Sequence, residues 1–203
     1  MRVFSITGAV LAALLWAVPG SAQEETGAIS ATDKSAVEGM LADWPEASRK
    51  AGEATMQSYG QPDGATSGML VWKDAGPWKA IMLTREPVDH QFPMPHKDVL
   101  EQVIDYQVPP EKFDDLARYD GSVIVERTKG TMSARCDKEA MNYLALNLAN
   151  DIVTGKRSVE DARAFYAKTA KAFKGGEKHP YTQQLQFKAA RSGTADPDKP
   201  AGM

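Results

Sequence analysis

The most closely spaced chemistry-bearing residues in the sequence are Asp89, His90, Met94 and His96. Imidazole and thioether groups are suitable ligands for copper, and imidazole also suits zinc. Met94 and His96 are two positions apart, so in extended chain their side chains point the same way. Six residues of extended chain span about 20 Å, so His90 joins them only if the segment turns back. The pattern predicts a copper or zinc site formed by His90, Met94 and His96, with Asp89 as a further ligand.

A second interpretation of these histidines stays open. The segment 84–98 contains three prolines, which favour irregular structure. A rigid surface connection of this kind can hold histidines that only hydrogen-bond to nearby backbone. The spacing itself matches no established metal-binding motif.

Two tryptophans flank a predicted turn and form the second candidate site. Trp72 and Trp78 stand on either side of a Gly-Pro pair, and Lys79 follows directly. Aromatic rings beside a cation can stack on a sugar, a peptide or an aromatic ligand. Together with Phe92 in the neighbouring proline-rich segment, they predict an open apolar groove for a small molecule or an exported protein. The alternative is that each indole covers one end of a sheet.

The single cysteine, Cys136, stands at the end of a predicted strand and just before a predicted helix. The first backbone N–H groups of a helix favour a thiolate, which would make the cysteine reactive. Strand alternation instead points the side chain inward beside Val123, where thiols behave as small inert hydrophobes. With no second cysteine, a Cys-x-x-Cys redox cycle is not predicted.

Familiar catalytic motifs are missing from the sequence. It has no Gly-x-Ser-x-Gly, no His-Glu-x-x-His, no phosphate-binding loop and no Gly-x-Gly-x-x-Gly. A formal charge of −3 also gives no electrostatic footprint for nucleic acid. We therefore expect a non-enzymatic module that binds a ligand or protein, or alternatively a protein that binds copper or zinc. An enzyme would require Cys136 or a histidine in a cleft with a partner within hydrogen-bond reach.

The N-terminus is typical of a Sec-type signal peptide. Residues 1–22 begin with the positive Arg2, continue with an apolar stretch and end in Gly20-Ser21-Ala22, a small-residue cleavage site. The apolar stretch is short for a membrane span, which needs about 20 residues. We expect cleavage near Ala22, export to the periplasm or the cell exterior, and no membrane segment in the remaining chain.

Composition divides the rest of the chain into three parts. Residues 23–32 are small and polar and predict a flexible lead, and residues 33–187 carry the apolar periodicity of one domain. Residues 188–203 are rich in Pro, Gly, Asp and Ala, which predicts a disordered tail.

The predicted elements alternate between helices and hairpins. Helical spacing and caps predict helices over 34–59 (interrupted near Pro45), 111–119, 138–153 and 159–173, whereas alternation predicts strands over 69–73, 78–83, 99–108, 122–128 and 131–136. Residues 180–187 would add an edge strand. Because hairpins imply antiparallel pairing, we expect an α+β fold with an antiparallel sheet of about five strands and helices mainly on one face.

Overall fold

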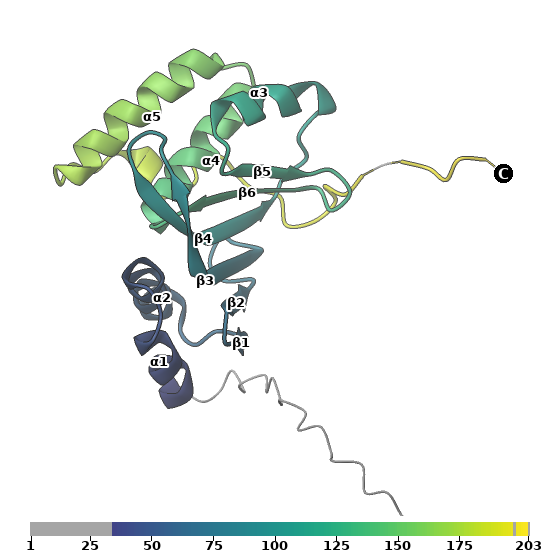
Figure 1. Cartoon of the computed structure of the whole chain (residues 1–203). Helices are drawn as coiled ribbons and strands as arrows, with labels where there is room; N and C mark the ends of the chain where they lie inside the picture. Colours follow the sequence, from purple (N-terminus) through teal and green to yellow (C-terminus); the bar gives the residue numbers. More distant parts are fainter. Residues whose placement is uncertain (1–33, 197, 203) are drawn as a thin grey trace, which may run out of the picture.

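The computed structural model describes residues 34–196 and 198–202 (Figure 1). The predicted signal peptide, 1–22, and the predicted lead, 23–32, lie outside the described residues. The predictions for these two segments therefore remain predictions.

A six-stranded antiparallel sheet forms the centre of the described chain, in the order β1-β2-β3-β4-β6-β5. The α+β class is confirmed, with one strand more than expected, because a short edge strand forms in a segment whose turn-rich sequence predicted a loop. The strands are β1 (Gly64–Thr66), β2 (Met69–Lys73), β3 (Ala80–His90), β4 (His96–Asp105), β5 (Val123–Glu126) and β6 (Thr131–Cys136).

The helices pack against this sheet and against one another (Figure 1). α2 packs against β3 and β4, α4 packs against β4 and β6, and α5 packs on α3 and α4. Within the described residues, no helix combines the length and apolarity that crossing a membrane requires. The helices are α1 (Lys34–Ala42), α2 (Glu46–Tyr59), α3 (Phe113–Tyr119), α4 (Glu139–Val153) and α5 (Val159–Lys174), with 3-10 turns η1 (Pro110–Lys112) and η2 (Pro180–Thr182).

Two hairpins pair in a register two residues away from the one that loop length predicts. A four-residue loop over 74–77 would pair Leu70 with Ile81, and a two-residue loop over 129–130 would pair Val125 with Ala134. The structure instead pairs Leu70 with Leu83 and Val125 with Met132. A shift of two leaves every side chain on its predicted face, whereas a shift of one would reverse the faces. Residues therefore share faces as the alternation predicts. The alternation does not say which face of residues 69–83 is buried, because both faces there are apolar, and in β6 both faces are buried except at Arg135.

The proline-rich segment between residues 84 and 98 is regular, contrary to the sequence-based expectation. β3 continues to His90 and β4 begins at His96, so the segment is the end of a long hairpin. Pro87 falls where the pairing shifts between Leu83 and Val88, a place where a missing backbone N–H breaks no ladder bond. The remaining prolines lie in the turn or beside it. The hairpin end extends beside α5 (Figure 1).

The residues after α5 form no edge strand. Residues 180–187 contain the short turn η2 and then irregular chain, because their backbone groups bond to a helix side chain instead of a strand. Asn147 of α4, 1% exposed, donates to the carbonyl oxygens of Tyr181 and Gln184 and accepts from the N–H of Gln186. This single buried side chain thus holds the segment in place.

The segment whose composition predicts disorder runs back along the sheet. Ala190 bridges to Asp105 of β4, and Arg127 pairs with Asp196 and Asp198. A few specific contacts of this kind hold a segment that buries little apolar surface. Composition alone gives no sign of such contacts.

Substituting Gly130 with alanine is expected to release this C-terminal segment. Gly130 has a φ of +65°, and an added Cβ would lie 1.8 Å from the carbonyl oxygen of Thr194. Backbone strain of this type costs about 1–3 kcal/mol before the clash is counted. We expect a lower free energy of unfolding in urea and faster proteolysis near residue 194. Gly121→Ala is the matched control, because nothing lies within 4 Å of a Cβ there; equal effects of the two changes would contradict the prediction.

Candidate functional site

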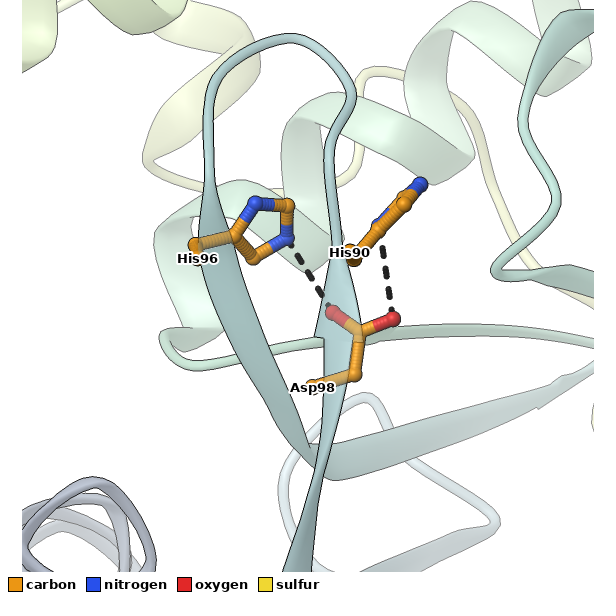
Figure 2. A group of neighbouring side chains, drawn as sticks. All are labelled: His90, His96 and Asp98. Carbon is orange, nitrogen blue, oxygen red and sulfur yellow. Dashed lines mark ion pairs between the residues drawn. The ribbon is translucent and has the colours of Figure 1, made fainter.

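The β3–β4 hairpin brings together two histidines and one aspartate. His90 pairs with His96 across the ladder, and their ring centroids are 4.8 Å apart. Asp98 lies two residues after His96, on the same face of β4. Figure 2 shows its carboxylate facing both imidazoles. The turn back that the metal-site prediction required for His90 is therefore present.

Asp98 is the centre of this cluster and is 1% exposed. Its Oδ1 lies 3.1 Å from Nε2 of His96, and its Oδ2 lies 3.3 Å from Nδ1 of His90 (Figure 2). Ser122 donates its hydroxyl proton to Oδ2. Among the described residues, Nε2 of His96 is the polar partner of Oδ1, and the two share a hydrogen bond only when Nε2 carries a proton.

A backbone contact determines which ring nitrogen of His96 carries the proton when the ring is neutral. Nδ1 lies 2.8 Å from the carbonyl oxygen of Met94, which can only accept, so Nδ1 carries a proton. In the neutral ring, Nε2 then presents its lone pair to Asp98 Oδ1. Two lone pairs 3.1 Å apart repel each other, so a positive species must lie between them: either a proton on Nε2 or a metal ion.

His90 has further polar partners besides Asp98. Its Nδ1 lies 3.2 Å from Oγ of Ser122, and its Nε2 lies 3.5 Å from Oδ1 of Asp120. Asp120, 3% exposed, also accepts from the backbone N–H of Ser122. The turn before β5 therefore supplies a second carboxylate and a hydroxyl that orient His90.

The surroundings shift the pKa values of the central pair in opposite directions. Burial opposes a charge on His96, but its contacts with Asp98, Cys136 and the Met94 carbonyl outweigh burial and raise its pKa to about 11. Burial likewise opposes a charge on Asp98, but His96, Ser122 and His90 outweigh burial and lower its pKa. Metal-free protein therefore holds an ion pair at this position.

The stability of the metal-free protein is expected to depend on pH through this pair. Because the folded pKa of His96 is raised, its contribution is complete below 6.5, the ordinary value, and is lost as pH rises toward 11. The lowered pKa of Asp98 gives a contribution that is complete above 3.8 and is lost in more acidic solution. The free energies of unfolding of wild type and Asp98→Asn, measured in urea, should differ most between pH 3.8 and pH 6.5. A difference that does not change with pH would contradict this prediction.

Met94 and Asp89 lie outside the cluster that the sequence predicts they join. Met94 contributes its carbonyl oxygen to His96, while its thioether lines a neighbouring cavity. Asp89 is exposed and pairs with Lys97 on the adjacent strand. Of the predicted metal ligands, the structure thus brings together His90 and His96, with Asp98 in place of the thioether.

The predicted tryptophan groove is not formed by its two indoles. Trp72 is 2% exposed and donates to the carbonyl oxygen of Gly60. Trp78 is fully buried, donates to Oε1 of Glu139 at 2.7 Å and packs on the ring of Tyr143. The alternation pattern could not show this, because a residue just outside a strand can still turn into the core.

The other two predicted ligand-binding residues also have structural partners. Lys79 pairs with the buried Asp105, with Nζ 2.5 Å from Oδ1. Phe92, in the hairpin turn, packs edge-on against Tyr166 and lies under the guanidinium of Arg163. Phe92 therefore attaches the hairpin end to α5.

Cys136 lies beside the cluster and is 4% exposed. Burial raises the pKa of its thiol, although the contact with His96 acts in the opposite direction. The thiol donates to Oδ1 of Asp137. The inward orientation that strand alternation predicts is confirmed, and a protonated buried thiol is a poor nucleophile.

A cavity of about 400 Å³ opens next to His96 and Cys136. The hairpin turn, the end of β6, the start of α4 and the face of α5 enclose it. Its walls are mainly apolar, and they are formed by Pro93, Met94, Pro95, His96, Cys136, Asp137, Lys138, Met141, Tyr166, Ala170, Phe173 and Lys174.

Comparison with known proteins gives no relative. No family model, curated protein or solved structure matches this chain. The site is therefore interpreted from its own geometry.

Sequence reasoning missed Asp98, Asp120 and Ser122. Asp98 could have been found from the sequence, because it stands two positions after His96 and shares its face in any strand that begins at residue 96. The prolines before residue 96 argued against such an early strand start. Asp120 and Ser122 are about 30 residues away from His90 in sequence, and only the order of strands brings them near it.

Proposed function

We propose that this protein binds a divalent transition metal, zinc or copper, through His90, His96 and Asp98. The observation that supports the proposal most directly is the convergence of one nitrogen of His96 and one of His90 on the two carboxylate oxygens of the buried Asp98. One ligand atom from each residue lies within 4.8 Å of the others. Imidazole nitrogen and carboxylate oxygen are ligand types common to zinc and copper sites.

The distances suit an ion between these groups. Ligand atoms about 2.0–2.2 Å from a tetrahedral metal are about 3.3–3.6 Å apart. Nε2 of His96 lies 3.1 Å from Oδ1 of Asp98, and Nδ1 of His90 lies 3.3 Å from Oδ2, so small shifts would bring the ligand atoms to these separations. Metal-binding histidines usually donate their other ring N–H to a nearby acceptor, which orients the ring. In His96, Nδ1–H donates to the carbonyl oxygen of Met94 in this way. Three ligands would leave a coordination position for water or a further molecule.

The proton is the competing occupant of the same position. At neutral pH the imidazole of His96 must lose its proton before Nε2 can bind a metal, so metal uptake would release a proton. This cost lowers the affinity in acid but does not prevent binding. The competition therefore gives the proposal a measurable signature in addition to binding itself.

Metal titration of the purified, chelator-treated chain tests the proposal. We expect one equivalent of Zn²⁺ or Cu²⁺ to remain bound after desalting and to raise the melting temperature. A ligand at 100 times its Kd stabilises the folded state by about 2.7 kcal/mol. Calorimetry in buffers of different ionisation enthalpy should show proton release. Absence of bound metal together with an unchanged melting temperature would overturn the proposal.

The predicted signal peptide would place this proposed metal site outside the cytoplasm. An exported metal-binding protein would meet zinc and copper in the periplasm or at the cell exterior. Comparing the mass of the protein recovered from cells with that of the full chain tests cleavage near Ala22. A recovered protein that retains residues 1–22 would contradict export with cleavage.

A further inference from the structure

The carboxylate of Glu139, at the start of α4, is held on one side and open on the other. Its Oε1 accepts hydrogen bonds from the Tyr59 hydroxyl, from the Trp78 indole at 2.7 Å and from the Gln102 amide at 2.9 Å. Trp78 and Gln102 are fully buried, so Oε1 faces the core. Its Oε2 accepts no hydrogen bond from any described residue and is not sealed from solvent. The carboxylate therefore presents one oxygen with free lone pairs away from the core.

Glu139 lines a cavity of about 340 Å³, here called the α2–α4 cavity. One wall belongs to α2, and residues 137–139 form the opposite wall. Leu100 and Gln102 of β4, both buried, form the floor. Because Oε1 is bound on the core side, Oε2 is the oxygen on the side of this cavity.

The charge of Glu139 has no counter-charge among the described residues. The groups bonded to its Oε1 are a phenol, an indole and an amide, which are all neutral. Two lysines line the α2–α4 cavity, but both already have partners. Lys50 pairs with Glu46, and the ammonium of Lys138 pairs with Asp137. After these pairings one negative charge remains in the cavity, which favours a positively charged ligand.

The walls of the α2–α4 cavity favour an organic cation over a metal ion. Ala47, Ala51 and Ala54 leave an apolar wall on α2, and the volume lies within the range of small-molecule pockets. Metal ions such as calcium take six or more oxygen ligands. Glu139 belongs to no group of metal-type ligands among the described residues. A molecule with one cationic end and a small apolar body fits both the charge and the walls.

We propose that the α2–α4 cavity binds a small organic ammonium compound, whose N–H group donates to Oε2 of Glu139 and whose apolar body lies against the alanines of α2. The site shares no residue with the proposed metal site and requires no metal. A hydrogen bond between an ammonium and a carboxylate is charge-assisted and stronger than one between neutral groups. The three donors on Oε1 fix the carboxylate before the ligand arrives, which lowers the entropic cost of binding.

Calorimetric titration of the chain with benzylamine, benzyl alcohol and benzoate tests the inference, at neutral pH in buffer containing a chelator. The three probes share one aromatic body and differ in charge. We expect benzylamine to bind about tenfold or more tightly than benzyl alcohol, the ratio that one charge-assisted hydrogen bond gives. Benzoate should bind most weakly, because Glu139 repels it. Equal affinity for the amine and the alcohol, or no binding of benzylamine, would overturn the proposal.

Two variants locate the binding. Glu139→Gln should remove the preference for the amine over the alcohol, because the amide carries no charge. Ala54 is an exposed residue of the cavity wall, so Ala54→Leu should narrow the cavity and weaken all three probes without disturbing the core. Benzylamine binding that Ala54→Leu leaves unchanged would place the ligand elsewhere and overturn the proposal.

Matched controls for both variants come from α5. Glu160→Gln removes a carboxylate from the first turn of that helix, and Ala164→Leu enlarges an exposed alanine. Both residues lie outside the α2–α4 cavity, so benzylamine affinity should stay within a few fold. Melting temperatures separate loss of binding from loss of folding, and if Glu139→Gln does not fold, Ala54→Leu decides the question. Because a chelator is present, these results do not depend on whether the metal proposal holds.

Discussion

Replacing His96 with alanine is expected to weaken zinc binding by about 100-fold or more. Losing the hydrogen bond that orients a metal ligand already lowers metal affinity by about 10–100-fold, and losing the ligand itself costs more. Asp98→Asn should have a similar effect, since an amide oxygen is a poorer metal ligand than a carboxylate. The measurement is a competition titration against a chromophoric chelator. Melting temperatures in zinc-free buffer separate loss of binding from loss of folding.

Matched controls for the metal ligands come from the same chain. His179→Gln removes the only histidine outside the cluster. Asp89→Asn removes an exposed carboxylate of the same hairpin, and Met94→Leu removes the thioether but keeps the carbonyl that bonds to His96. All three should retain zinc affinity within a few fold. If Met94→Leu weakened zinc as strongly as His96→Ala, the ligand set would be the one that the sequence predicted, with the thioether included.

Substituting Trp78 with alanine is expected to lower the free energy of unfolding by about 3–5 kcal/mol, the usual cost of truncating a buried aromatic ring. The indole is fully buried and its N–H bonds to Glu139, which also accepts from Tyr59 and Gln102. Urea unfolding measures the change. Trp78→Phe should cost less, because the ring contact with Tyr143 is partly kept.

An exposed lysine on the adjacent strand serves as the control for Trp78. Lys73→Ala should change stability by no more than about 0.5 kcal/mol, as surface substitutions usually do. A Trp78→Ala protein of nearly wild-type stability would mean that the indole is not a core residue. It would restore the interpretation of this tryptophan as part of a ligand-binding surface.

The sequence predicted the sheet faces better than the pairing. Alternation placed Val125 and Met132 on one face of their hairpin, as the structure does, because the face depends only on odd or even position along the strand. It could not choose the buried face of residues 69–83, where both faces are apolar. The register depends on how many residues the turn uses, and both hairpins use two more than the Gly-containing turns suggested. Since an error of two preserves the face, the shared faces were predicted correctly although the pairing was not.

Only the histidines of the His90, His96 and Asp98 cluster could be predicted from the sequence. His90 and His96 stood out because their chemistry is rare in this chain, which has three histidines. Aspartate is common, so Asp98 and Asp120 gave no comparable signal, and their partnership with histidine depends on strand order. The cavity depends on four separate elements meeting, which no local pattern encodes.

The contacts of Ala190, Thr194 and Asp196 with the sheet have a consequence for the timing of folding during synthesis. β4 and the β5–β6 turn are made well before these residues, yet they complete their hydrogen bonds only with them. A nascent chain in which residues 184–203 are still inside the ribosome therefore lacks those bonds, although all six strands have been synthesised. Such a chain stays easier to unfold until these residues emerge.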